Sequence, residues 1–505
     1  MGERVARWVD RAVERAARSL GLDDPGPPQA SPVLAAVPPR AVPARPAATA
    51  PPAAAAVATA VLDGQGAVIA QVLADFGVDA MVTGSVTGPA VTTWRLRPGP
   101  GVKVEKIAGL TGNMAMELGT AHVRVVPVVD GEPGVMAVEV PAPQRTDVWL
   151  PALLGPLGDR HPLQVALGAD TYGRPVLDNL ARMLHLLIAG ATGAGKSEFL
   201  NSLLCGLLSQ ATPAQLRLLL VDPKRVELIA YAGVPHLVTQ IVTEPGPAVS
   251  ALEWATAEMD RRYQLLAAAG VSHIDAYNAA AAAAGEEPLP YLVVVVDELA
   301  DLMILARDDV ETSIERLAQL ARAAGIHLVL ATQRPTVDVV TGRIKANLPS
   351  RLAFATVSAT DSRTILDAGG AERLLGAGDG LYLGPGTSSL RRVQGPRVSA
   401  EHVRQVVAAA RATGLAPTGM RVTLPALPAR PAAADADGDE LLERAEALVR
   451  WAGEGSVNRL RREFGVGHAR ASRLLDLLEQ RGVVGPADGV NPRPVLPEEP
   501  AGTTE

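Results

Sequence analysis

Residues 184–204 read LHLLIAGATGAGKSEFLNSLL, and this stretch decides the fold. An apolar run at 184–189 leads into the pattern G-x-x-x-x-G-K-[ST] at 190–197, and a helical stretch follows at 198–208. A strand, a glycine-rich loop and a helix in this order predict a phosphate-binding loop (P-loop), because glycines let backbone N–H groups wrap an anion at a helix N-terminus. The residues that we expect to bind the nucleotide are Gly190, Ala191, Thr192, Gly193, Ala194, Gly195, Lys196 and Ser197.

Two residues of the loop have separate roles in the nucleotide site. A second strand supplies the carboxylates that complete this site. Lys196 is expected to reach the β- and γ-phosphates of ATP, and Ser197 to hold Mg²⁺. The apolar run at 292–296 ends in Asp297 and Glu298. We expect Asp297 to bind Mg²⁺, directly or through water, and Glu298 to act as the catalytic base that polarises the attacking water. The alternative is that both acids only cap the helix that follows.

A third strand, at 326–331, is followed by Thr332, Gln333, Arg334 and Pro335. It places an amide and a guanidinium at the carboxyl edge of the same sheet. Gln333 is therefore a candidate catalytic residue that senses the γ-phosphate. A loop-capping role for Gln333 is equally open from the sequence.

The composition sets bounds on the class of protein. The net charge of −7 argues against a general nucleic-acid coat, although it allows DNA binding at a local patch or inside a ring. The single cysteine excludes an intramolecular disulfide and fits a reducing cytosol. No signal peptide and no apolar run of about 20 residues is found, so we expect a soluble cytoplasmic protein. Only five of the 47 basic residues are lysines, which marks the surviving lysines as informative.

Texture divides the chain into segments. Strands alternate with helical stretches in the largest one, as in a doubly wound parallel sheet. The expected segments are an amphipathic N-terminal helix at 1–22, a Pro/Ala-rich linker at 23–59, a small α+β domain at 60–150, an α/β domain at 151–415, a second linker at 416–437, a helical domain at 438–498 and a tail at 499–505. The first helix is interpreted as solvated or self-associating, with a membrane-surface anchor as the alternative.

The chain resembles the FtsK/SpoIIIE family of hexameric double-stranded DNA translocases. The resemblance is dense rather than a single motif, and it covers about four-fifths of the chain. The segments that carry it are 188–193, 221–224, 234–237, 258–263, 296–303, 322–328, 331–335 and 361–367. Residues 60–150 also look like the family's α domain, and the C-terminus looks like its γ domain.

The resemblance implies an α/β fold with a RecA-like P-loop motor domain, a small α+β domain before it and a C-terminal winged-helix domain. It further implies a homo-oligomer, a hexameric ring, with ATP at subunit boundaries. Arg322 lies where the family's arginine finger is expected, and an arginine there stabilises charge on the transferred phosphoryl group. Without the resemblance, a plain surface arginine stays open.

Loops inside such a ring grip phosphates rather than bases, because a motor travels over any sequence. Arg334, Lys345 and Arg363 lie in segments that resemble these loops. The chain departs from the family at Ala359, where many relatives carry a lysine. One DNA contact is therefore expected to be lost or moved.

The C-terminal segment has the charge pattern of a DNA reader. Residues 441–451, 456–464 and 468–481 are predicted to be helices, and 455–481 hold six arginines against three acids. This pattern is typical of a winged helix that places its third helix in a major groove. Expected DNA contacts there are Arg470 and Arg473, with His468 as a weaker candidate. A small helical protein-interaction module is the alternative. The tail after Gly485 is predicted to be mostly irregular.

The sequence therefore predicts an ATP hydrolase that translocates double-stranded DNA, with ATP and Mg²⁺ as cofactors. Family members at the division septum usually carry transmembrane helices before their linker. Their absence here favours a shorter, plasmid- or prophage-borne relative, and residues 1–22 are expected to recruit a membrane-associated partner. The rival prediction is an ATPase of a protein-secretion system, which uses a similar motor but generally repeats it and lacks a winged helix.

Overall fold

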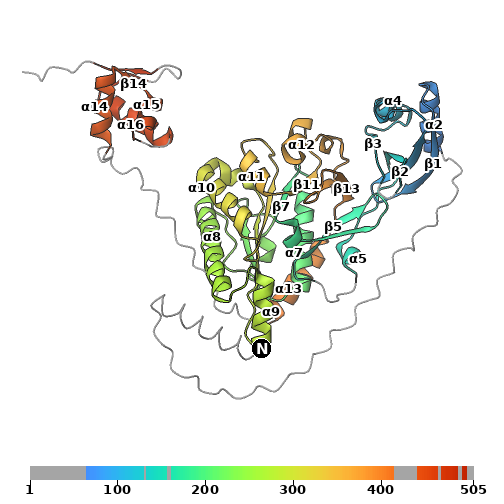
Figure 1. Cartoon of the computed structure of the whole chain (residues 1–505), viewed down its shortest axis with the longest axis horizontal. Coiled ribbons are helices and arrows are strands. Elements are labelled where there is room, and N and C mark those ends of the chain that lie inside the picture. The colour runs from blue at the N-terminus through green and yellow to red at the C-terminus, as the bar shows by residue number, and fades with distance from the viewer. Residues whose placement is uncertain are drawn as a thin grey trace, which may run out of the picture. The chain divides into compact units, whose positions relative to one another are not determined.

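A computed structural model gives the fold of most of the chain. It describes residues 64–129, 132–155, 161–413, 441–464, 468–486 and 492–496, with the backbone alone at 458, 461, 462 and 468–470. The chain forms two compact units, residues 1–425 and 426–505, which are described separately (Figure 1). The predicted N-terminal helix, both linkers and the final tail lie outside the described residues.

A small antiparallel sheet opens the first unit. Its strands are β1 (Ala80–Thr87), β2 (Val91–Pro98), β3 (Arg124–Val126) and β4 (Met136–Pro141), in the order β1-β2-β4-β3. The helices are α2 (Gly64–Asp75), α3 (Val104–Ala108) and α4 (Thr111–Glu117). Ile69 of α2, Met114 of α4 and Trp94 of β2 are all at most 1% exposed and share one core. The predicted α+β layer is therefore confirmed.

A nine-stranded sheet forms the rest of this unit, in the order β6-β5-β13-β12-β11-β7-β10-β9-β8. Its strands are β5 (Gln164–Asp170), β6 (Pro175–Asn179), β7 (Leu186–Ala189), β8 (Leu216–Val221), β9 (Tyr291–Val296), β10 (Ile326–Thr332), β11 (Ser350–Phe354), β12 (Asp379–Leu383) and β13 (Leu390–Gln394). The five strands from β11 to β8 are parallel.

The other four strands of this sheet depart from the parallel pattern. β12, β13, β5 and β6 pair antiparallel. Only residues 171–174 separate β5 from β6. A parallel pair needs a crossover of a dozen or more residues, so a connection this short forms a hairpin.

Helices cover both faces of the large sheet. They are α5 (Leu150–Leu154), α6 (Leu180–Met183), α7 (Lys196–Gln210), α8 (Pro245–Ala268), α9 (Ile274–Ala284), α10 (Leu299–Leu320), α11 (Gly342–Asn347), α12 (Ala359–Leu366) and α13 (Ala400–Ala412). β9 shows why its sequence is a continuous apolar run. Val293 and Val295 pack in the core that contains α7, and Val294 and Val296 point to the opposite face and are also 0% exposed. None of the helices in the described ranges combines the length and apolar character that crossing a bilayer requires.

In its described residues the second unit has three helices, α14 (Leu442–Ala452), α15 (Val457–Phe464) and α16 (His468–Gln480), which confirms the prediction for this segment. Leu460 and Leu474 are fully buried in its core. β14 (Glu454–Gly455) pairs antiparallel with β15 (Arg493–Pro494). The tail that was predicted to be irregular thus contributes one strand of a wing, and a two-residue strand is too short to show a periodic pattern.

Candidate nucleotide-binding site

The P-loop connects β7 to α7 and depends on glycine at two positions. Gly193 has φ +77° and Gly195 has φ +119°, a region that favours glycine. A Cβ on Gly195 would lie 2.5 Å from the backbone nitrogen of Gly378. That nitrogen donates to the carbonyl of Ala194 at 2.8 Å. The loop is therefore packed directly against the backbone that leads into β12.

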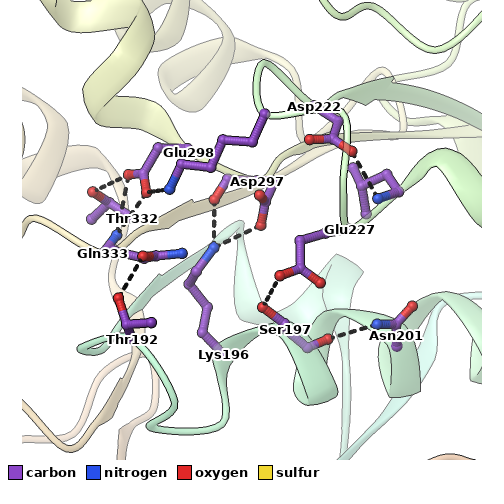
Figure 2. Close-up of polar contacts among 12 residues, drawn as sticks. Thr192, Lys196, Ser197, Asn201, Asp222, Glu227, Asp297, Glu298, Thr332 and Gln333 are labelled. Atoms are coloured by element: carbon purple, nitrogen blue, oxygen red, sulfur yellow. Dashed lines mark hydrogen bonds and ion pairs between the residues drawn. The ribbon is translucent and has the colours of Figure 1, made fainter.

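Lys196 and Asp297 meet inside the protein. Lys196 Nζ donates to Asp297 Oδ1 at 2.6 Å and to the Asp297 carbonyl at 2.7 Å, and the two side chains are 3% and 0% exposed (Figure 2). β7 and β9 are parallel and separated only by β10, so their carboxyl ends lie at one sheet edge. The structure thus brings the P-loop and the Asp-Glu pair together, as the sequence predicted.

Oxygen atoms gather beside this pair. Ser197 Oγ donates to Glu227 Oε1 at 2.6 Å. Asp297 Oδ2 and Asp222 Oδ1 are buried, and neither has a hydrogen-bond partner among the described residues. Burial raises the pKa of Asp297 even though Lys196 opposes the shift. Carboxylate oxygens that lack partners, next to a serine hydroxyl, fit a hard divalent cation such as Mg²⁺.

The described residues contain no group of three His, Cys, Asp or Glu side chains that is arranged around a metal position. Mg²⁺ is usually held by one or two carboxylates together with phosphates and water.

Glu298 is held in one orientation by three donors. Its Oε2 accepts from Lys224 Nζ at 2.7 Å, and its Oε1 accepts from Thr332 Oγ1 at 2.7 Å and from the Gln333 backbone N–H at 3.1 Å. Burial raises the pKa of Glu298, but the hydrogen bonds from Lys224 and Thr332 outweigh burial and bring the pKa below its ordinary value. The carboxylate is therefore ionised at neutral pH, the state that a general base requires.

Gln333 links Glu298 to the P-loop. Its backbone N–H donates to Glu298, and its side-chain Oε1 accepts from Thr192 Oγ1 at 3.0 Å (Figure 2). The side chain of Gln333 therefore lies against the loop, at the wall of a cavity of about 380 Å³. The cavity extends past Ser197 to Arg397, which pairs with Asp147 at 2.8 Å.

Three residues of this site received no role from the sequence. Asp222, Lys224 and Glu227 lie in the loop after β8, which pairs with β9. Lys224 pairs with Glu298 and Glu227 accepts from Ser197. The scarcity of lysine and the charged run that directly follows a buried strand were the signals available for them.

Arg322 lies far from the P-loop of its own chain. It occupies the turn between α10 and the amino end of β10, whereas Gln333 follows the carboxyl end of that strand. Seven residues of β10 separate the two ends, about 23 Å at ~3.3 Å per residue. The Arg322 side chain is exposed, and no acidic side chain of the described residues forms an ion pair with it.

The candidate DNA contacts on the first unit differ in their surroundings. Arg334 and Arg363 are exposed. Lys345 is already paired, because its Nζ lies 2.8 Å from Asp367 Oδ1, and Arg351 binds the other oxygen of the same carboxylate. The bonds from Lys345 and Arg351 outweigh partial burial and lower the pKa of Asp367. Lys345 is thus not a free cation here.

The C-terminal candidates lie on α16. Arg473 is exposed. The side chains of His468 and Arg470 lie outside the described residues, so only their place at the start of α16 is known. Arg493 of β15 pairs with Asp476 and Glu479, which ties the wing to this helix.

A nine-stranded α/β sheet with a P-loop after one strand, and an Asp-Glu pair two strands away, defines a P-loop ATPase domain. The comparisons with known proteins give its family. The FtsK/SpoIIIE family model matches residues 158–337, the FtsK alpha domain model matches 47–142 and the Ftsk gamma domain model matches 436–498. The chain belongs to the FtsK/SpoIIIE family, with a RecA-like P-loop domain, a small α+β domain before it and a C-terminal winged-helix domain.

The names of similar proteins agree with this family assignment. A DNA translocase FtsK of Mycobacterium tuberculosis (strain ATCC 25618 / H37Rv) is 49% identical over 453 residues, which are 86% of this chain and 54% of the relative. A DNA translocase FtsK of Streptomyces avermitilis is 48% identical over 453 residues, 87% of this chain and 50% of the relative. The chain thus spans about half the length of these relatives.

Among solved structures, the cytoplasmic domain of the Thermomonospora curvata Type VII secretion ATPase EccC is similar to this chain. The identity is 26% and the TM-score is 0.48, over 56% of this chain and 36% of that chain.

Proposed function

We propose that this protein is an ATP-hydrolysing motor that moves double-stranded DNA, for the segregation or transfer of a chromosome or plasmid. The observation that carries the proposal is the convergence of Lys196, Asp297 and the clamped Glu298 at one edge of the sheet. Family membership and the DNA translocase names of the relatives support DNA as the substrate.

In this proposal the P-loop backbone binds the phosphates of ATP. Lys196 turns from Asp297 toward the β- and γ-phosphates. Ser197 and Asp297 would hold Mg²⁺, which would supply positive charge beside the phosphates. The partnerless Oδ2 of Asp297 supports this assignment, because a buried carboxylate oxygen is otherwise costly.

Glu298 is proposed to take the proton of the attacking water. A carboxylate has about four acceptor positions, and Glu298 accepts four hydrogen bonds from its three donors. The attacking water is proposed to take the place of the longest of them, at 3.3 Å from the Gln333 N–H to Oε2. Gln333 is proposed to sense the γ-phosphate, because its amide contacts the P-loop and its backbone contacts the base.

Arg322 is proposed to act in the site of a neighbouring subunit. The length of β10 keeps it from its own P-loop, and its exposed guanidinium is available to another chain. The family resemblance supports a homo-oligomeric ring, with a hexamer as the expected size.

Double-stranded DNA is the proposed partner of Arg334 and Arg363 in the ring and of Arg470 and Arg473 in the winged helix. Lys345 is proposed to reach a phosphate only after it leaves Asp367, so its contribution is expected to be smaller. This weighting differs from the equal weight that the sequence suggested.

The domain limits given from the sequence remain proposals, as does the role of residues 1–22 in recruiting a membrane-associated partner. The cytoplasm is the proposed location, since ATP and the DNA to be moved are both there.

The test is steady-state ATP turnover with and without long duplex DNA, in the wild type and in Lys196→Ala. We expect duplex DNA to stimulate turnover strongly in the wild type and Lys196→Ala to be inert. Equal turnover with and without duplex would contradict the DNA motor and favour another substrate for the same ATPase.

A further inference from the structure

Helix α8 carries a polar cluster that the nucleotide site does not use. Residues 258–263 read EMDRRY, and α8 lies alongside α10 (Figure 1). Glu258 accepts from Arg262 Nε at 2.8 Å and from Arg261 Nε at 2.7 Å. Arg262 is 1% exposed and Glu258 is 5% exposed. A buried ion pair is by itself weak evidence for stability, and this pair has further contacts.

The cluster contacts the turn that carries Arg322. The second arm of Arg262 reaches out of the ion pair, and its Nη1 donates to the carbonyl of Ala324 at 2.9 Å. The adjacent Tyr263 donates its hydroxyl to the carbonyl of Leu320 at 2.5 Å. Two consecutive residues of α8 therefore hold the backbone on either side of Arg322.

Carbonyls at this turn are unusually well satisfied. The last carbonyls of a helix lack partners within the helix, and the end of α10 is such a place. Besides the two bonds from α8, His185 Nε2 contacts the Ala318 carbonyl at 3.2 Å, and the Ile274 N–H donates to the Ala323 carbonyl at 2.8 Å. The carbonyls of Leu317, Ala321 and Arg322 accept hydrogen bonds from backbone N–H groups of the turn and of the first residue of β10.

The side chain of Arg322 contrasts with its backbone. The backbone is fixed from four directions, by α8, by α9, by His185 just before β7 and by the turn itself. The guanidinium, in contrast, is exposed and forms no ion pair within the described part of the chain. A fixed backbone that carries an unpaired guanidinium is the arrangement expected of a residue that acts on another chain. The backbone loses little further conformational freedom when the guanidinium binds.

We propose that Arg262 and Tyr263, with Glu258 behind them, are positioning residues that aim Arg322 into the nucleotide site of the neighbouring subunit. This inference rests on the proposed ring function. It assigns the 258–263 motif to catalysis in trans rather than to the site of its own chain.

The test uses two substitutions that keep packing nearly intact. Tyr263→Phe removes one hydroxyl. Arg262→Lys keeps the charge opposite Glu258 but lacks the fork that reaches Glu258 and the Ala324 carbonyl together. Tyr277→Phe is the matched control, since Tyr277 of the neighbouring α9 makes no side-chain hydrogen bond among the described residues. We expect the double variant to lower kcat about tenfold, as for the loss of two ordinary hydrogen bonds, with KM for ATP within about twofold.

Mixed rings separate positioning from a local defect. The double variant keeps an intact P-loop, and Lys196→Ala keeps an intact Arg322 turn. Rings that contain both chains, isolated by two different affinity tags, pair the P-loop of one with the turn of the other. We expect their turnover to exceed that of either parent, and rings of Lys196→Ala with Arg322→Ala to recover in the same way.

The outcomes are distinct. If duplex DNA does not stimulate ATP turnover in the wild type, the proposed function is wrong, and so is this inference. With an active wild type, full activity in Arg322→Ala overturns the finger. With Arg322→Ala impaired, the positioning role is overturned either if the double variant matches Tyr277→Phe or if the mixed rings show no recovery.

Discussion

Lys224 is the residue whose replacement tests the site most directly. Its ammonium lies 2.7 Å from Glu298 Oε2, and Glu298 is 2% exposed. The pKa of Glu298 lies below its ordinary value because this bond and the one from Thr332 outweigh burial. Lys224→Met removes a donor and a charge at once, and burial then acts with less opposition. The pKa of Glu298 must therefore rise in the variant.

The size of the effect follows from the contact. A hydrogen bond to a charged group contributes about 1.5–3 kcal/mol, and the 35% exposure of the Lys224 side chain places this one near the lower end. About 1.4 kcal/mol is a tenfold change in an equilibrium constant, so a proton binds Glu298 about tenfold more tightly in the variant. A base works only when ionised, so activity is lost at a higher pH than in the wild type.

The assay is kcat/KM for DNA-stimulated ATP turnover as a function of pH. The acidic limb of the profile is expected to move toward neutral pH in Lys224→Met. Lys103→Met is the control, because the exposed Lys103 lies beside α3, next to the small sheet. Profiles of Lys224→Met and the wild type that superimpose, or a shift toward lower pH, would refute the reasoning about Glu298.

Three further outcomes can be measured. Arg392→Met leaves two buried carboxylates, Asp379 and Glu139, without their shared cation, and should lower the free energy of unfolding by about 3–5 kcal/mol in urea denaturation, while the exposed pair member Arg404→Met should not differ from wild type. Gly195→Ala should abolish nucleotide binding in a fluorescent-nucleotide titration, because its Cβ meets backbone at 2.5 Å; equal affinity in the variant would contradict the close packing of the loop. Deletion of residues 438–505, which lie in a separate compact unit, should leave ATP turnover stimulated by long duplex DNA, and its complete loss would refute the modular assignment.

The sequence predicted the parts of the fold that local pattern determines. The P-loop, the buried strand before Asp297 and the strand before Gln333 each follow from a short run of residues with a known spacing. Their convergence followed from one further rule, that the carboxyl ends of parallel strands share an edge.

What the sequence could not supply depends on which strands are neighbours. Lys224 reaches Glu298 across 74 residues of chain because β8 pairs with β9, and no local pattern gives that order. The antiparallel pairing of β12, β13 and β5 likewise depends on which strands are neighbours. Contacts such as Tyr263 with Leu320, 57 residues apart, arise from helix packing that single-sequence periodicity does not define.

The length of strand β10 has a consequence for when the protein hydrolyses ATP. In the proposed ring, one end of this strand presents Gln333 to the chain's own nucleotide and the other presents Arg322 to a different one. A solitary copy then holds two unmatched halves of separate reaction centres. On dilution, the rate of ATP hydrolysis should fall more steeply than the protein concentration. Monomers in the cell would not hydrolyse ATP until they assemble with other copies on DNA.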